Sequence, residues 1–133
     1  MYSKLNMTHN SKALVISCID FRFQSQVRKF LIDRGLEDNY DLVCTAGSIK
    51  SVDDHLVKQI KISSDLHHIE EIILINHQDC GAYGLEVTGN EEMEIHKKDL
   101  IKAKNIISQD FPSITRDNIS LYYFKLDGTS DRI

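Results

Sequence analysis

Residues 13–22 read Ala-Leu-Val-Ile-Ser-Cys-Ile-Asp-Phe-Arg, an apolar run that ends in a cysteine, an acid and a base. A second apolar run, at 72–75, is followed by Asn76 and then by His-Gln-Asp-Cys at 77–80. Short runs rich in β-branched residues are typical of strands that are buried on both faces of a parallel sheet. The two stretches therefore predict two buried strands, each of which ends in polar residues that can carry chemistry.

Strand patterns alternate with helix patterns along the rest of the chain. This alternation predicts an α/β fold, with a mostly parallel sheet of about four to five strands, right-handed crossovers and flanking helices in three layers. We expect one domain over residues 13–133 and a loose N-terminal arm over residues 1–12. Strands are expected at 13–18, 40–44, 71–76 and 119–126, with a tight turn at 127–128 that leaves room for one short strand.

Three helices are predicted from their apolar stripes and end signals. The first has its stripe within residues 23–31, and Gly35 is positioned to end it. The second starts near Ser51, a capping residue with an acid three positions later. The third spans about 91–108, with Asn90 as its cap. Its expected inner face carries His96, Leu100, Ala103 and Ile107.

The polar ends of the two strands predict a common site. Ligands of parallel sheets bind at the carboxyl ends of the strands, where Cys18, His77 and Cys80 are expected to lie. Two cysteines and one histidine form a zinc ligand set that leaves a fourth position free for chemistry. Because side chains alternate along a strand, Asp20 and Arg22 should point to the same side as Cys18. Arg22 can then orient Asp20 and lower its pKa.

The residues alone leave plainer interpretations of these side chains open. Cys18 can be a small buried hydrophobic residue, which is what an unpaired cysteine usually is. His77 and Cys80 can be an accidental pair. Asp20 and Arg22 can be an ion pair that closes the end of a strand.

Other polar residues have weaker signals. Cys44 lacks polar companions in its strand and is expected in the core. His55 and His96 lie in helices without a matching acid or cysteine, and proton relay is the functional role open to them. Residues 67–68, both histidines, are expected to be exposed at a helix end, and the acids within 91–94 to do no more than favour a helix start.

Composition limits the class of protein. The chain has 133 residues, and its net charge of −4 argues against nucleic acid or an anionic membrane surface as a partner. Its apolar runs are shorter than the ~20 residues of a membrane helix, and residues 1–12 lack the apolar segment of a signal peptide. Three widely spaced cysteines fit a reducing compartment better than a disulfide framework, so a cytoplasmic protein is expected.

In its two motifs, at 18–22 and 77–80, the chain resembles the β-class carbonic anhydrases. That family has a C-x-D-x-R motif after its first strand and an H-x-x-C motif after its third, which match residues 18–22 and 77–80. Ala-Gly-Ser at 46–48 is similar to the turn after the family's second strand, and residues 122–128 are similar to its fourth strand and hairpin turn. The resemblance covers about residues 13–130.

The resemblance implies a zinc enzyme that hydrates CO₂ reversibly to bicarbonate. Cys18, His77 and Cys80 would hold Zn²⁺, and a zinc-bound hydroxide would attack CO₂, with a buffer or a surface histidine carrying the proton away. The resemblance also implies two arrangements of Asp20. It either pairs with Arg22, which leaves the metal open to water, or it becomes the fourth metal ligand and closes the site. A homodimer or a higher even oligomer is expected.

Three departures from the family pattern concern the pocket. Phe21 stands where the family usually has serine, the N-terminal segment is shorter, and so is the stretch between Cys80 and the last helix. In the family these regions help to wrap the dimer and to line the substrate pocket, so an open or reshaped pocket is expected. Two other functions therefore stay open: hydrolysis of a related heterocumulene, such as carbonyl sulfide or carbon disulfide, and a non-catalytic zinc-binding role.

Overall fold

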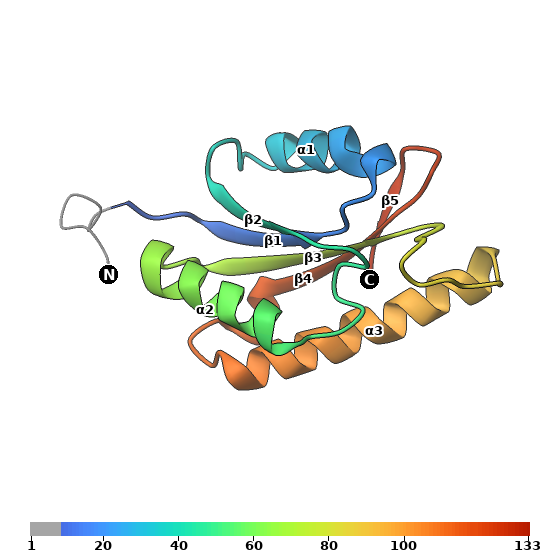
Figure 1. Cartoon of the computed structure of the whole chain (residues 1–133). Coiled ribbons are helices and arrows are strands. Elements are labelled where there is room, and N and C mark those ends of the chain that lie inside the picture. The colour runs from blue at the N-terminus through green and yellow to red at the C-terminus, as the bar shows by residue number, and fades with distance from the viewer. Residues whose placement is uncertain (1–8) are drawn as a thin grey trace.

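The sheet of this protein lies between two layers of helices (Figure 1). The computed structural model describes residues 9–133, and its five strands lie in the order β2-β1-β3-β4-β5. The first four in this order run parallel, and β5 is antiparallel to β4. The strands are β1 (Ala13–Ser17), β2 (Tyr40–Cys44), β3 (Glu71–His77), β4 (Ile119–Phe124) and β5 (Ser130–Arg132). The helices are α1 (Gln24–Asp33), α2 (Asp54–His67) and α3 (Gly89–Asp110), with 3₁₀ turns η2 (Phe21–Phe23) and η3 (Arg116–Asn118).

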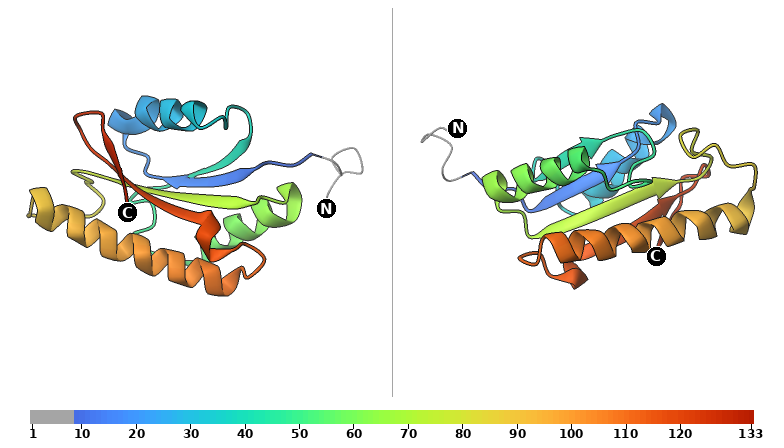
Figure 2. Two further views of the ribbon diagram at one scale, coloured as in Figure 1. Left: turned by 180° about the vertical axis from the view of Figure 1, so that it is seen from behind. Right: turned by 60° about the horizontal axis from the view of Figure 1, so that its bottom comes forward.

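The core has two halves, one on each face of the sheet. Helix α1 covers one face, and α2 and α3 cover the other (Figures 1 and 2). Alternate side chains of β1 serve both halves: Leu14 and Ile16 pack in the cluster that contains Leu100 of α3. Val15 packs in the cluster that contains Leu31 of α1. Each such side chain stabilises the fold by roughly 1.5–3 kcal/mol on burial. Helices on both faces of the sheet confirm the three-layer α/β prediction.

The central pair of strands positions the site. Strands β1 and β3 are neighbours inside the sheet, with Ala13 opposite Glu71 and Ile16 opposite Leu74. Because the two strands are parallel, their carboxyl ends meet at one edge of the sheet. The residues that follow β1 and end β3 therefore lie side by side, as the sequence predicts.

The predicted starts of two helices were wrong by a few residues. Helix α2 is capped by Asp53, whose side chain accepts a 2.9 Å hydrogen bond from the Leu56 N–H, and not by Ser51. Helix α3 begins at Gly89, after Thr88, and not after Asn90. Several residues in each stretch are able to cap a helix, so composition located the start only approximately.

The N-terminal arm expected at residues 1–12 falls mostly on residues 1–8, which lie outside the described part of the chain. Of the remainder, Ser11 donates its N–H to the carbonyl oxygen of His67 (2.9 Å), and His9 packs edge-on against the same histidine. Within residues 9–133, no helix combines the length and the apolar character that crossing a bilayer requires.

Candidate metal centre

Cys18, His77 and Cys80 meet at the carboxyl ends of β1 and β3. Cys18 follows the last residue of β1, His77 is the last residue of β3, and Cys80 lies in the turn after it. The two sulfur atoms are 3.9 Å apart, and the three ligand atoms all lie within 4.8 Å of one another. All three side chains are buried. The structure thus brings together the three residues that the sequence predicts as a ligand set.

The imidazole of His77 is held in the form that a metal requires. Its Nδ1 donates to the carbonyl oxygen of Gln78 (2.8 Å), which leaves Nε2 with the free lone pair. This Nε2 is buried and has no hydrogen-bond partner among residues 9–133. Burial lowers the pKa of His77, so the ring is neutral. An unpaired, neutral ring nitrogen in a buried position is suited to coordinate a cation.

The donor atoms also fit zinc in type and spacing. Two sulfurs that each lie ~2.3 Å from a tetrahedral zinc are about 3.8 Å apart, close to the spacing found here. Burial and the neighbouring Cys18 raise the pKa of the Cys80 thiol, because two adjacent thiolates repel each other without a cation between them. The Gly47 N–H also donates to the Cys18 sulfur (3.4 Å). The pair of thiols and the imidazole thus form a site that a soft dication would stabilise.

Asp20 and Arg22 lie beside this cluster, but not on a strand. The strand ends at Ser17, and Asp20 caps the 3₁₀ turn η2 by accepting the Arg22 N–H (2.9 Å). The expectation that alternation along a strand aligns the two side chains was therefore wrong. They are aligned by the turn, in which Arg22 Nε donates to Asp20 Oδ1 (3.1 Å) and Arg22 Nη2 to Asp20 Oδ2 (2.7 Å).

Of the two arrangements of Asp20, the structure has the one in which it is paired with Arg22. Hydrogen bonds from Arg22 are the main cause that lowers the pKa of Asp20 to about 2. Asp20 Oδ2 nevertheless lies only 3.9 Å from His77 Nε2. The carboxylate is thus charged, held from one side and next to the candidate ligands.

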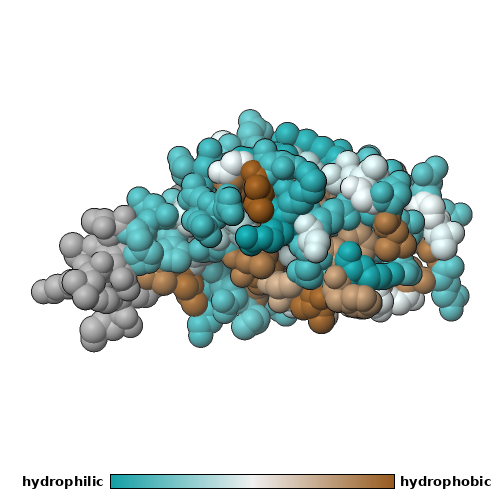
Figure 3. Space-filling model, turned by 90° about the horizontal axis from the view of Figure 1, so that it is seen from above, coloured by the Kyte–Doolittle hydropathy of each residue, from teal (hydrophilic) through white to brown (hydrophobic). Residues whose placement is uncertain are grey.

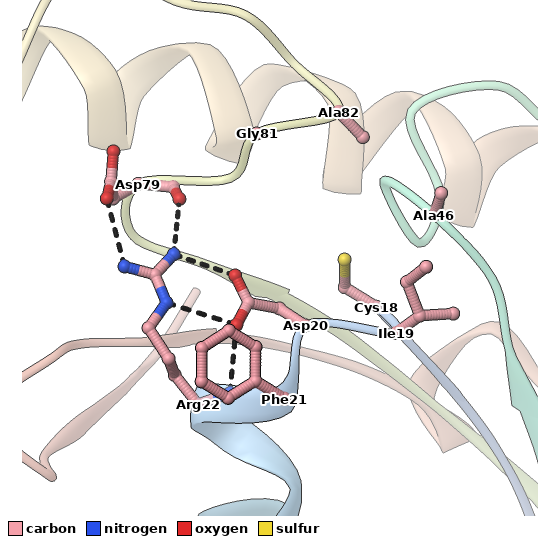
Figure 4. Close-up of a pocket in the computed structure, with 9 residues that line it drawn as sticks. All are labelled: Cys18, Ile19, Asp20, Phe21, Arg22, Ala46, Asp79, Gly81 and Ala82. Atoms are coloured by element: carbon pink, nitrogen blue, oxygen red, sulfur yellow. Dashed lines mark hydrogen bonds and ion pairs between the residues drawn. The ribbon is translucent and has the colours of Figure 1, made fainter.

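Asp79 is a further member of the site that sequence reasoning missed. Arg22 Nη1 donates to Asp79 Oδ2 (3.0 Å), and Arg22 Nη2 donates to the Asp79 carbonyl oxygen (2.8 Å), so Arg22 bridges two aspartates (Figure 4). The signal was its position inside the H-x-x-C motif, between His77 and Cys80.

An open cavity of about 610 Å³ lies beside the cluster, and Cys18 is the one of its three residues that lines the cavity. Cys18, the Asp20–Arg22 pair, Ala46 and Gly81 contribute to its walls (Figure 4). Ile19 and Phe21 also line it, yet they are 59% and 85% exposed. Phe21 therefore presents an uncovered apolar ring to this cavity.

A second polar cluster is buried between β3 and α3. Asn76 Nδ2 is 2.8 Å from the Tyr83 hydroxyl and 2.9 Å from His96 Nδ1. His96 is fully buried, as its place on the predicted inner face requires. Its Nε2 has no hydrogen-bond partner among residues 9–133 and lies 4.0 Å from Glu92 Oε2.

Cys44, His67 and His55, whose signals in the sequence are weaker, differ in exposure. Cys44 is exposed, which corrects the expectation of a core position, because β2 is an edge strand. His67 is half-buried and paired with Asp41 (Nδ1 to Oδ2, 2.7 Å), so the expectation of an exposed side chain was wrong for it. His55 is exposed on α2 and lines a neighbouring cavity that shares Ala46 and Ala82 with the cavity beside Cys18.

The buried His96 predicts a loss of stability in acid. Burial lowers the pKa of His96 to about 4, against about 6.5 in an unfolded chain. Above pH ~6.5 the ring is neutral in both states; as the pH falls from there to about 4, only the unfolded chain takes up the proton. Between pH ~6.5 and about 4, the unfolding free energy of wild type should therefore fall by up to about 3 kcal/mol more than that of His96→Gln. Urea titration of metal-free protein at both pH values measures this.

His55→Gln, at an exposed position on α2, is the matched control for that experiment. It should follow wild type. Equal acid sensitivity of wild type and His96→Gln would contradict the prediction.

One family model and two relatives of uncharacterized function match the sequence. The family model described as “Putative carbonic anhydrase” matches residues 8–125. An uncharacterized protein of Rickettsia bellii (strain RML369-C) is 31% identical over 147 residues, which cover 97% of this chain and 85% of the relative.

Solved structures share the fold at low identity. A chain of the tetrameric β-carbonic anhydrases of the filamentous ascomycete Sordaria macrospora matches with a TM-score of 0.69 and 14% identity, over 98% of this chain and 84% of that one. The apo form of a carbon disulfide hydrolase matches with a TM-score of 0.60 and 20% identity, over 92% of this chain and 78% of that one. At these identities the likeness concerns the fold.

Proposed function

This chain belongs to the family described as “Putative carbonic anhydrase”, and from that premise we propose that it is a zinc enzyme that reversibly hydrates carbon dioxide to bicarbonate. The observation that carries the proposal is the Cys18, His77 and Cys80 cluster, whose ligand atoms lie within 4.8 Å of one another beside a carboxylate held by Arg22.

The proposal gives each residue of the site a role. Cys18, His77 and Cys80 hold the metal. Zinc bound there would supply a Lewis acid that activates water for attack. Asp20 accepts a hydrogen bond from the reacting water and orients it, and Arg22 keeps Asp20 turned away from the metal. The apolar side of the cavity, next to Ile19, receives the small uncharged substrate.

The proposed activity is tested by measuring zinc and CO₂ hydration on the same purified sample. We expect one zinc per chain under reducing conditions and CO₂ hydration that depends on it. Protein that takes up no zinc, before or after zinc addition, would contradict the metal site. Full zinc without CO₂ hydration at any pH from mildly acidic to alkaline would contradict the activity and leave a zinc-binding protein.

Hydrolysis of carbonyl sulfide or carbon disulfide is the second candidate function. Phe21, which lines the cavity and is 85% exposed, makes the cavity more apolar, which suits a heterocumulene more hydrophobic than CO₂. The fold is also shared with a protein named carbon disulfide hydrolase. Release of sulfide from either substrate by zinc-loaded protein, at a higher kcat/KM than CO₂ hydration, would favour this function.

We also propose that the protein acts in the cytoplasm, since its three widely spaced cysteines fit a reducing compartment.

We further propose that the protein forms a homodimer or a higher even oligomer. From above, hydrophilic side chains cover most of the molecule, while hydrophobic ones gather along one edge of the view (Figure 3). Leu42, on the edge strand β2, is 48% exposed, and Phe21 is uncovered as well. Burying such side chains favours association. Light scattering at tens of micromolar should give an even multiple of 15.3 kDa; a monomer mass would contradict it.

A further inference from the structure

Glu92 is a buried acid that reaches the turn between His77 and Cys80. Only 4% of its surface is exposed, and its Oε2 accepts a 2.6 Å hydrogen bond from the backbone N–H of Asp79. Glu91 and Glu94, on the same helix, are exposed. Burying a carboxylate is costly unless it is hydrogen-bonded. The burial of this one acid among its neighbours therefore indicates a specific partner. Its hydrogen bond comes from the Asp79 N–H, and His96 Nε2 lies farther away, 4.0 Å from the same oxygen.

The Asp79 peptide is in a conformation that needs support. Its φ is +57°, in the left-handed region, which costs most residues with a side chain roughly 1–2 kcal/mol and which aspartate adopts more readily than most. In this conformation the N–H and the carbonyl oxygen of Asp79, which belong to successive peptide units, bond to different partners. Its N–H points to Glu92, while its carbonyl oxygen and its carboxylate both accept hydrogen bonds from Arg22. Arg22 in turn holds Asp20 through two further hydrogen bonds.

We propose that Glu92 is a positioning residue for the candidate zinc site. It is distinct from the ligands and acts through Asp79: it fixes the Asp79 peptide, which fixes the Arg22 guanidinium, which keeps Asp20 in place. A charged acceptor strengthens the first bond of this series, because hydrogen bonds to ionised groups are roughly twice as strong as neutral ones. The inference rests on the proposed function for the role of Asp20, whereas the Glu92–Asp79 contact is a property of the metal-free chain.

The same contact also couples α3 to the ligands. Asp79, whose N–H donates to Glu92, lies between His77 and Cys80 in the chain, so a change at Asp79 alters the path of the chain between two ligands. Residues that hold the ligands of a metal site typically contribute 10- to 100-fold to metal affinity. Loss of Glu92 should thus weaken zinc binding as well as disturb Asp20.

Three variants test the proposal: Glu92→Leu removes the acceptor, Glu92→Gln keeps a neutral one, and Glu91→Leu is the matched control at an exposed position. The first measurement is hydrogen exchange of the Asp79 amide by NMR in reduced, metal-free, full-length protein. We expect protection in wild type and Glu91→Leu, at least about a tenfold loss in Glu92→Leu, and partial retention in Glu92→Gln. The second is zinc affinity by chelator competition, expected to fall about 10- to 100-fold in Glu92→Leu and less in Glu92→Gln.

Each outcome decides. A Glu92→Leu protein that loses stability while Asp79 protection and zinc affinity stay within about twofold of Glu91→Leu would make Glu92 merely structural and overturn the proposal. If Glu92→Leu does not fold, an Asp79 amide in wild type that exchanges as fast as a free one overturns it equally. Neither measurement uses CO₂, so a wild type with full zinc affinity and no hydration activity would contradict the proposed function and leave this inference standing.

Discussion

Cys80→Ser is expected to weaken zinc binding by about 100-fold or more. Structural zinc sites bind with roughly 10–16 kcal/mol shared among their ligands, so one ligand contributes about 3 kcal/mol. Serine keeps the shape of the side chain but replaces a soft thiolate with a hydroxyl, which is a poor ligand at neutral pH. Because bound zinc would stabilise the folded chain by mass action, a 100-fold loss of affinity should also cost about 2.7 kcal/mol of unfolding free energy at saturating zinc. Chelator competition and urea unfolding with and without zinc measure the two effects.

Cys44→Ser provides the control for this prediction within the same chain. Cys44 is exposed and donates to the Cys18 carbonyl oxygen (Sγ to O, 3.3 Å), a bond that a serine hydroxyl can also make. It should bind zinc like wild type. Equal zinc affinity of Cys80→Ser and Cys44→Ser would show that the metal does not sit between the strand ends.

Asp20→Ala is expected to lower CO₂ hydration by on the order of 10²-fold while zinc content stays near one per chain. The two thiols and the imidazole remain in this variant, so the metal keeps the ligands that hold it. What is lost is the carboxylate that Arg22 holds 3.9 Å from the His77 ring nitrogen. Steady-state hydration rates beside zinc analysis of the same sample separate the two effects.

Arg22→Ala and Asp33→Ala complete that experiment. Arg22→Ala should also reduce activity, because it frees Asp20 to move toward the metal. Asp33 is an exposed acid paired with Lys29 (Oδ2 to Nζ, 2.7 Å), and its replacement should leave the rate unchanged. Wild-type rates in Asp20→Ala would mean that this carboxylate is structural.

The fold could be predicted to a large extent because its signals are local. The second strand was expected at 40–44 and is found at Tyr40–Cys44, since apolar residues between turn residues define it. Alternation of strands and helices led to the parallel order, and parallel order placed the two polar stretches at one edge. Helix starts were harder, because Ser51 and Asp53 both cap well and only the folded chain selects Asp53.

The site could be predicted only as far as its motifs reach. Cys18, His77 and Cys80 stand in recognisable spacings, and the structure brings them together. Glu92 has no such signal: it is one of several acids at a helix start, and its burial depends on a turn 13 residues earlier in the chain. Cys44 looks like a core residue in sequence, but its exposure depends on β2 being at the edge. The burial of Glu92 and the exposure of Cys44 both depend on how elements distant in the sequence are arranged, which local patterns do not encode.

The adjacency of β1 and β3 also sets the moment during folding at which a metal can be captured. Cys18 and Cys80 are 62 residues apart in the chain, and their sulfurs meet once β1 has paired with β3. Such non-local pairing is slow compared with the formation of a single helix. Uptake of the ion at full affinity therefore marks the time at which the middle of the sheet closes. A zinc indicator present during refolding would therefore report the time at which β1 pairs with β3.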